Sequence, residues 1–267
     1  MKFGISTKVM RDFSLKDTIS VAGDLGYDII EIWIDDYLLS GFTADEVLKM
    51  TEDKNLKVSV HLRTDDLNIA SFNDGIREES LKQAKDGIYI ASSLKAEDVT
   101  LHPGRKTSKT NSVIEAFEVQ RASVKELSDI ACEYGVKLCV EGMEKINGEF
   151  ITSPEDLREL IKGCNKKSTF VTVDIAHLYT WGDVIKNLEY MKNFPVSNVH
   201  ISQANDKKIH LPLFSPDGKI DYKDVFKTLY SFYDGGVVVE GYVKNMGMEI
   251  AEKSINWYKN IMRECEV

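Results

Sequence analysis

The amino-acid sequence predicts a single (β/α)8 barrel, the TIM-barrel class of α/β fold, over residues 1–267. Short apolar, β-branched runs alternate strictly with longer segments of helical period, which is typical of parallel βα units. The runs are apolar on both faces, as expected for buried parallel strands. Eight such units in 267 residues match the usual size of this barrel, about 250 residues.

Each expected strand is a short run rich in Val, Ile and Leu. In chain order the runs are KFGIS (2–6), DIIEIW (28–33), KVSVH (57–61), DVTLH (98–102), KLCVE (137–141), FVTVD (170–174), SNVHI (197–201) and GVVVE (236–240).

The expected helices lie between these runs. The first ends at Gly26, a typical C-cap, and the fifth opens with Ser153 and Pro154, a favourable N-cap and first-turn pair. A doubly wound open sheet is the alternative fold, but Thr7, Lys8 and Val9 follow the first strand in place of a glycine-rich phosphate loop. The helical segments are 15–25, 44–53, 76–94, 113–134, 154–163, 183–193, 222–233 and 247–263.

Composition excludes several classes of protein. The chain carries 34 Lys and Arg against 43 Asp and Glu, a net charge of −9, which argues against general nucleic-acid binding while leaving room for a local basic patch. No apolar run approaches the roughly 20 residues that cross a bilayer, and the first residues do not form a signal peptide. The four cysteines are scattered, so we expect reduced thiols in a cytoplasmic protein with no membrane association.

Residues that bind metals gather at the C-terminal ends of the expected strands, where this fold places its functional site. All five histidines of the chain lie there, together with three carboxylates. Imidazole and carboxylate together suit Zn²⁺, Mn²⁺ or Fe²⁺, whereas a site for Mg²⁺ or Ca²⁺ would be mostly oxygen. Of these, we expect Zn²⁺ or Mn²⁺. The chain has no GxSxG motif for a serine nucleophile. The eight residues are His61, His102, Glu141, Asp174, His177, His200, His210 and Glu240.

Two further residues near strand ends are open to more than one interpretation. Glu31 on the second strand is either a substrate ligand or acid–base group, or a carboxylate paired with a barrel lysine such as Lys8. Trp181, which follows the sixth strand, either walls a substrate pocket or packs beneath the loops.

Several local motifs resemble the xylose isomerase-like TIM barrel superfamily, which includes sugar and sugar-phosphate isomerases and epimerases and the endonuclease IV proteins. The likeness extends from the first strand to the last. The motifs that carry it are HLRTDDLNIAS (61–71), LHPGR (101–105), VEGME (140–144), VDIAHLYTWGD (173–183), HISQAND (200–206), HLPLFSPDGKID (210–221) and the closing VVVEGY.

The resemblance implies a set of metal ligands. Glu141, Asp174, His200 and Glu240 would hold a central divalent ion. In the endonuclease branch, His61 and His102 would join Glu141 at a second ion, and His177 and His210 would supply two of three ligands at a third. One to three ions are therefore expected. That branch has an Asp two residues before the second of these histidines, where this chain has Lys208, so a third ion would need Asp206 as a substitute.

Two enzyme functions follow on this scaffold. The first is a metal-dependent isomerase or epimerase of a small sugar or sugar phosphate, in which Glu141 and Glu240 transfer a proton through an enediolate. Arg105, Lys106 or Lys208 would then hold a phosphate.

The second is an endonuclease that hydrolyses DNA at abasic sites, with DNA as partner on this alternative alone. A barrel that binds metal without turnover is a third hypothesis, and in each case we expect a monomer or small homo-oligomer.

Overall fold

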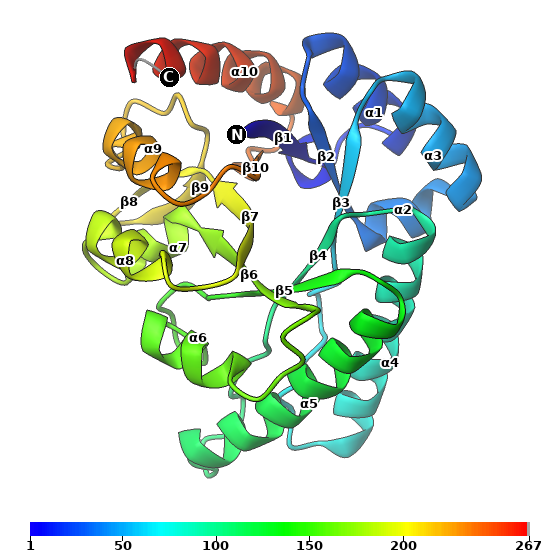
Figure 1. Ribbon diagram of the computed structural model, residues 1–267, viewed down its shortest axis with the longest axis vertical. Coiled ribbons are helices and arrows are strands. Elements are labelled where there is room, and N and C mark those ends of the chain that lie inside the picture. The colour runs from blue at the N-terminus through cyan, green and yellow to red at the C-terminus, as the bar shows by residue number, and fades with distance from the viewer. Residues whose placement is uncertain (266–267) are drawn as a thin grey trace.

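The computed structural model describes residues 1–265 and contains a closed barrel of eight parallel strands (Figure 1). The strands follow one another around the barrel in the order β1-β10-β7-β6-β5-β4-β3-β2. Closure between β1 and β10 confirms the predicted (β/α)8 barrel and excludes the open doubly wound sheet. The expected domain end at residue 267 lies outside the described residues.

The barrel strands begin and end within one residue of their expected positions. Two boundaries change the description of the site, because β4 ends at Leu101 and β10 at Val239, so that His102 and Glu240 are the first residues after their strands. The strands are β1 Lys2–Ser6, β2 Ile29–Trp33, β3 Lys57–His61, β4 Asp98–Leu101, β5 Lys137–Glu141, β6 Thr169–Asp174, β7 Val196–Ile201 and β10 Gly236–Val239.

Helices surround the barrel as an outer ring (Figure 1). All eight expected helices are present; the penultimate one ends at Tyr230, three residues earlier than expected. Gly26 ends the first helix in the left-handed conformation with φ +85°, and Ser153 caps the fifth expected helix at the Asp156 amide. These helices are α1 Leu15–Leu25, α3 Ala44–Asp53, α4 Asp74–Ser93, α5 Val113–Glu133, α6 Pro154–Ile161, α8 Val184–Met191, α9 Tyr222–Tyr230 and α10 Gly247–Glu264.

Short elements that the sequence pattern did not predict follow several strand ends. Helix α7 begins directly after β6 because the side chain of Asp174, the last strand residue, accepts a hydrogen bond from the His177 amide and caps the helix. An antiparallel hairpin follows β7 and carries His210 back over the barrel mouth. The additional elements are η1 Thr7–Met10, α2 Ile34–Ser40, α7 Ile175–Thr180, β8 Gln203–Asn205 and β9 Lys208–Leu211.

Side chains alternate between the helices and the barrel interior along each strand. Phe3 of β1 points outward, and its ring stacks on Tyr258 of α10 with 4.0 Å between centroids. The interior includes polar side chains that bond one another, such as the hydroxyls of Thr100 and Thr172, 2.9 Å apart. A hydrogen-bonded polar interior therefore lies beneath the strand ends. Within the described residues, no helix is long and apolar enough to cross a membrane.

Candidate metal centre and adjoining pocket

Four buried side chains converge at the C-terminal mouth of the barrel. Glu141 ends β5, Asp174 ends β6, His200 lies on β7 and Glu240 follows β10. Each offers one potential ligand atom, and these atoms all lie within 4.8 Å of one another. Parallel pairing brings residues distant in sequence to one level, since Asp174 is the register partner of His200. The structure thus brings together the whole predicted central set.

The contacts within this set centre on the His200 ring. Its Nδ1 lies 3.0 Å from Glu141 Oε1 and 3.4 Å from Glu240 Oε2. Asp174 Oδ1 accepts the His177 amide at 2.8 Å, whereas Asp174 Oδ2 is buried and has no hydrogen-bond partner. A buried carboxylate oxygen without a partner is costly unless something else binds it.

Charges at the centre stabilise one another. Burial, the largest single influence, raises the pKa of Glu141 and Glu240. The charge of His200, together with hydrogen bonds from the neighbouring histidines and, for Glu240, the charge of Lys8, outweighs it, so both carboxyl pKa values lie well below their usual range. Burial lowers the pKa of His200, and the nearby carboxylates Glu31, Glu240 and Glu141 raise it well above 6.5. Burial raises the pKa of Asp174. The central set thus combines the three carboxyl groups of Glu141, Asp174 and Glu240 with the single imidazole of His200. This excess of negative charge favours a cation.

Two further sets flank the centre. On one side, His61 Nε2 and His102 Nε2 lie 3.8 and 3.0 Å from Glu141 Oε2. On the other side, His177 Nε2 lies 3.3 Å from His210 Nε2. Burial lowers the pKa of His177, but the neighbouring carboxylates raise it to about 9. Potential ligand atoms also cluster in each set, as His61, His102 and Glu141, and as Asp174, His177 and His210.

The donor chemistry fits a divalent transition metal. The central set offers three carboxylates and one imidazole, a combination common to Zn²⁺ and Mn²⁺ sites. The ring of His61 is stacked on Trp33 at 3.9 Å between centroids, and its Nε2 is buried without a hydrogen-bond partner. Such fixed, unpaired donors are what a pre-formed metal site requires.

Asp206 does not substitute at the third set. Its carboxylate accepts the Tyr179 hydroxyl at 2.8 Å and pairs with Lys219, and its side chain is 71% exposed. Lys208 is exposed on β9. Asp174 is the carboxylate that stands beside His177 and His210.

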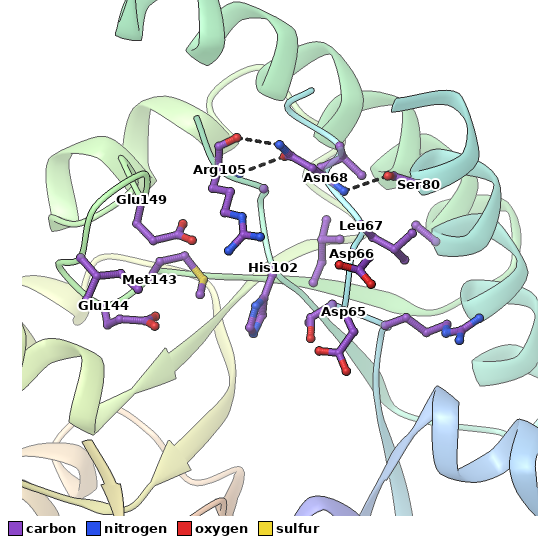
Figure 2. Close-up of a pocket in the computed structure, with 17 residues that line it drawn as sticks. Asp65, Asp66, Leu67, Asn68, Ser80, His102, Arg105, Met143, Glu144 and Glu149 are labelled. Carbon is purple, nitrogen blue, oxygen red and sulfur yellow. Dashed lines mark hydrogen bonds between the residues drawn. The ribbon is translucent and has the colours of Figure 1, made fainter. Parts of the chain in front are cut away.

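A cavity of about 450 Å³ adjoins the centre at His102. Figure 2 shows the Arg105 side chain pointing into it, with Glu149 and Glu144 on one side and Asp65 on the other. Burial, together with the charge of Glu144, raises the pKa of Glu149 to about 7. The pocket lies at the same end of the barrel as the candidate metal ligands and is large enough for a small-molecule ligand.

Asn68 holds two walls of this pocket together (Figure 2). Its side-chain oxygen accepts from the backbone amides of Ala70 and Arg105 at 3.1 and 3.0 Å, and its side-chain nitrogen donates to the Arg105 carbonyl at 2.8 Å. Gly104 has φ +85°, and a Cβ there would lie 2.6 Å from the Asn68 oxygen. The glycine of the HPGR segment is therefore required by both conformation and space.

The remaining predicted substrate ligands lie elsewhere. The Lys106 ammonium donates to the Ser108 carbonyl, and Lys106 lines a neighbouring hollow that shares Arg105 and Glu149 with the pocket. Trp181 donates its indole N–H to the Met143 carbonyl at 2.8 Å and packs over Gly142, as expected for support beneath a loop.

Glu31 does not line the pocket. It is fully buried beside His200, and Lys8, the lysine expected as its alternative partner, pairs instead with Glu240 at 3.9 Å.

Sequence reasoning assigned no role to several pocket residues. Asn68 lies within a motif that carries the family resemblance, but its bonds to the Arg105 backbone depend on a contact 37 residues away. Glu144 lies in the irregular loop after β5, yet its carboxylate is 3.5 Å from His177 Nε2. Glu149 lies in an irregular loop after β5, where no periodic pattern marks it.

Fold and site together define a (β/α)8 barrel with a histidine and carboxylate cluster at its C-terminal mouth. Residues 19–261 match the family model of the xylose isomerase-like TIM barrel, and the chain belongs to this family.

Two solved structures are informative. The chain is 27% identical to a D-tagatose 3-epimerase-like protein, covering 100% of this chain and 98% of that one, with a TM-score of 0.89. It shares its fold with the IOLI protein, solved with a zinc atom, at 20% identity, 99% and 98% coverage and a TM-score of 0.81.

Two of the curated relatives show the range of the likeness. An uncharacterised protein of Methanocaldococcus jannaschii, MJ1311, is 28% identical over 261 residues, or 96% of this chain and 88% of the relative. A probable endonuclease 4 of Aquifex aeolicus is 26% identical over 156 residues, covering 54% of each chain.

Proposed function

We propose that this protein is a divalent-metal-dependent sugar epimerase or isomerase. The observation that carries the proposal is the buried set of Glu141, Asp174, His200 and Glu240, whose ligand atoms lie within 4.8 Å of one another beside a sugar-sized pocket. The likeness to a D-tagatose 3-epimerase-like protein over the whole chain supports the same chemistry.

The four residues of this set would hold the cation, which would polarise the substrate carbonyl and its neighbouring hydroxyl. Glu141 and Glu240 are the proposed acid–base pair. They enter from β5 and from the end of β10, with β6 and β7 between them, so they approach a bound sugar from different directions. One carboxylate removes the proton from the carbon beside the carbonyl and leaves an enediolate. The other delivers a proton taken up from water to the opposite face, and the first releases its proton to water, so the substrate is neither oxidised nor reduced.

The charges of the pocket favour an uncharged sugar over a sugar phosphate. Asp65, Asp66, Glu144 and Glu149 line it, against the cations Arg63 and Arg105. Two contacts engage the Arg63 guanidinium, which donates to Asp35 at 2.7 Å and to Gln83 at 2.9 Å. Near neutral pH, a phosphate would therefore face the carboxylates of Asp65, Asp66 and Glu144 and a partly protonated Glu149, with one available arginine. Sugar hydroxyl groups can donate to those carboxylates.

The test is a chromatographic assay of purified protein, loaded with Mn²⁺ or Zn²⁺, against ketohexoses and their phosphates. We expect turnover of an uncharged sugar that is lost in Glu141→Gln and Glu240→Gln. Cys139→Ala should retain turnover, because Cys139 belongs to none of the ligand sets. It is a matched control, since Cys139 is buried on the same strand two residues before Glu141. Preference for a phosphate would contradict the substrate class, and unchanged rates in both Gln variants would contradict the mechanism.

A second candidate is an endonuclease acting at abasic sites in DNA. The two flanking ligand sets favour it, because with the central set they make three sets at one barrel mouth, as the resemblance to the endonuclease branch implies. The partial likeness to a probable endonuclease 4 agrees with it. The pocket's acidic lining opposes it, since phosphodiesters are anionic. Metal-dependent nicking of a duplex with one abasic site, abolished by Glu141→Gln, would establish this function in place of the first.

A further inference from the structure

Glu31 stands out as a buried carboxylate that belongs to none of the metal-ligand sets. It lies on β2 and is fully buried inside the barrel. Among residues 1–265, no lysine or arginine forms an ion pair with it, and its charged partner is the His200 ring. Burying a carboxylate without a fixed cation is expensive, so its presence calls for a role.

The carboxylate contacts of His200 divide between its two ring nitrogens, and Nε2 also lies 3.2 Å from the Asn198 side-chain nitrogen. Nε2 lies 2.8 Å from Glu31 Oε2, while Nδ1 faces Glu141 Oε1 and Glu240 Oε2 at 3.0 and 3.4 Å. The ring therefore stands between Glu31 on one side and two of the proposed ligands on the other. This is the arrangement in which a carboxylate fixes the proton of a metal-binding imidazole.

Asn198 holds the Glu31 carboxylate in place. Its side-chain nitrogen donates to Glu31 Oε2 at 3.0 Å, the same oxygen that faces His200. Asn198 and His200 are two residues apart on β7, so both side chains point into the barrel. The other oxygen, Glu31 Oε1, is buried without a partner, so the bonds of this carboxylate are concentrated on the atom that faces the ring.

We propose that Glu31 is a positioning residue that accepts the Nε2–H of His200 and thereby presents Nδ1 to the divalent cation. It acts through His200 and touches neither cation nor substrate. The role rests on the proposed function only in requiring that the central set binds a metal.

The experiment measures Zn²⁺ affinity by competition with a chromophoric chelator, independently of turnover. Loss of such an outer partner typically weakens metal binding about 10–100-fold, and we expect this for Glu31→Ala. Glu31→Gln keeps an oxygen acceptor, so it should recover most of the affinity. The matched control is Asp98→Ala, which truncates another buried carboxylate of the barrel, one that binds serine hydroxyls and not His200.

Wild-type affinity in Glu31→Ala, equal losses in the Ala and Gln variants, or an equal loss in Asp98→Ala would each overturn the proposal. If Glu31→Ala does not fold, ¹⁵N NMR of the histidine rings in the Zn²⁺-loaded wild-type protein still decides. A proton on Nε2 of His200 is expected, and a proton on Nδ1 would overturn the proposal. Failure of the wild-type protein to bind Zn²⁺ would instead refute the proposed metal centre itself.

Discussion

Asp98 lies on β4 inside the barrel and is 7% exposed. Its carboxylate accepts the hydroxyls of Ser59 at 2.6 Å and Ser197 at 3.4 Å. Burial raises its pKa from 3.8 to about 6, the Ser59 hydrogen bond opposes this, and the charge of Glu31 adds to it. The folded protein therefore prefers the protonated, neutral carboxyl group.

The sign and size of the effect on stability follow from this difference. Because the folded-state pKa is the higher one, the stability that neutral Asp98 provides is fully present below about pH 4 and is lost as pH rises through about 6. A difference of about two pKa units corresponds to about 3 kcal/mol. Asp98→Asn stays neutral at every pH. Relative to wild type, its free energy of unfolding should therefore be about 3 kcal/mol higher at pH 8 than at pH 4.

Urea unfolding of the wild-type protein and of Asp98→Asn at pH 4 and pH 8 gives the stability of the variant relative to wild type at each pH. The prediction concerns the change in this relative stability between the two pH values. Asp129→Asn is the control, because Asp129 is half exposed on α5 and pairs with Lys125 on the surface. Its change between the two pH values should stay within about 1 kcal/mol. The reasoning is refuted if Asp98→Asn shifts stability equally at both pH values.

Three further predictions concern the site and its support. His200→Ala should lose bound Zn²⁺ and Cys139→Ala should keep it, as measured by metal analysis after dialysis; full occupancy in His200→Ala would contradict the assignment. Asn68→Ala should lower the free energy of unfolding by about 2 kcal/mol in a urea titration, because it leaves the amides of Ala70 and Arg105 without acceptors. Ser112→Ala should cost about 1 kcal/mol in the same assay, since Ser112 forms a capping box at α5; no change would show that this cap contributes nothing.

The barrel was predictable because its strands are short, apolar and regularly spaced. KLCVE and GVVVE stand out from the amphipathic segments around them, and their ends locate Glu141 and Glu240 to within one residue. Helix caps such as Ser153 followed by Pro154 are likewise local signals. Strand runs and helix caps depend on residues that are adjacent in the sequence, so they can be predicted from the sequence alone.

Other features depend on contacts that no local pattern records. Helix α7 is six residues long and begins where a strand residue serves as its cap, so it has too few turns for periodicity to reveal. The contact between Glu31 and His200 joins residues 169 apart, and only closure of the barrel brings them together. Sequence reasoning therefore grouped the candidate metal ligands by their chemistry but could not separate them from the residue proposed to orient one of them.

Proton exchange in D₂O tests the central claim most directly. The metal-loaded protein is incubated with the uncharged ketohexose it converts, and the product is examined by NMR. Proton transfer by Glu141 and Glu240 predicts deuterium at the inverted carbon, and neither Glu141→Gln nor Glu240→Gln should form the inverted product while metal is bound. Inversion without deuterium at that carbon, or wild-type inversion in either variant, would contradict the account.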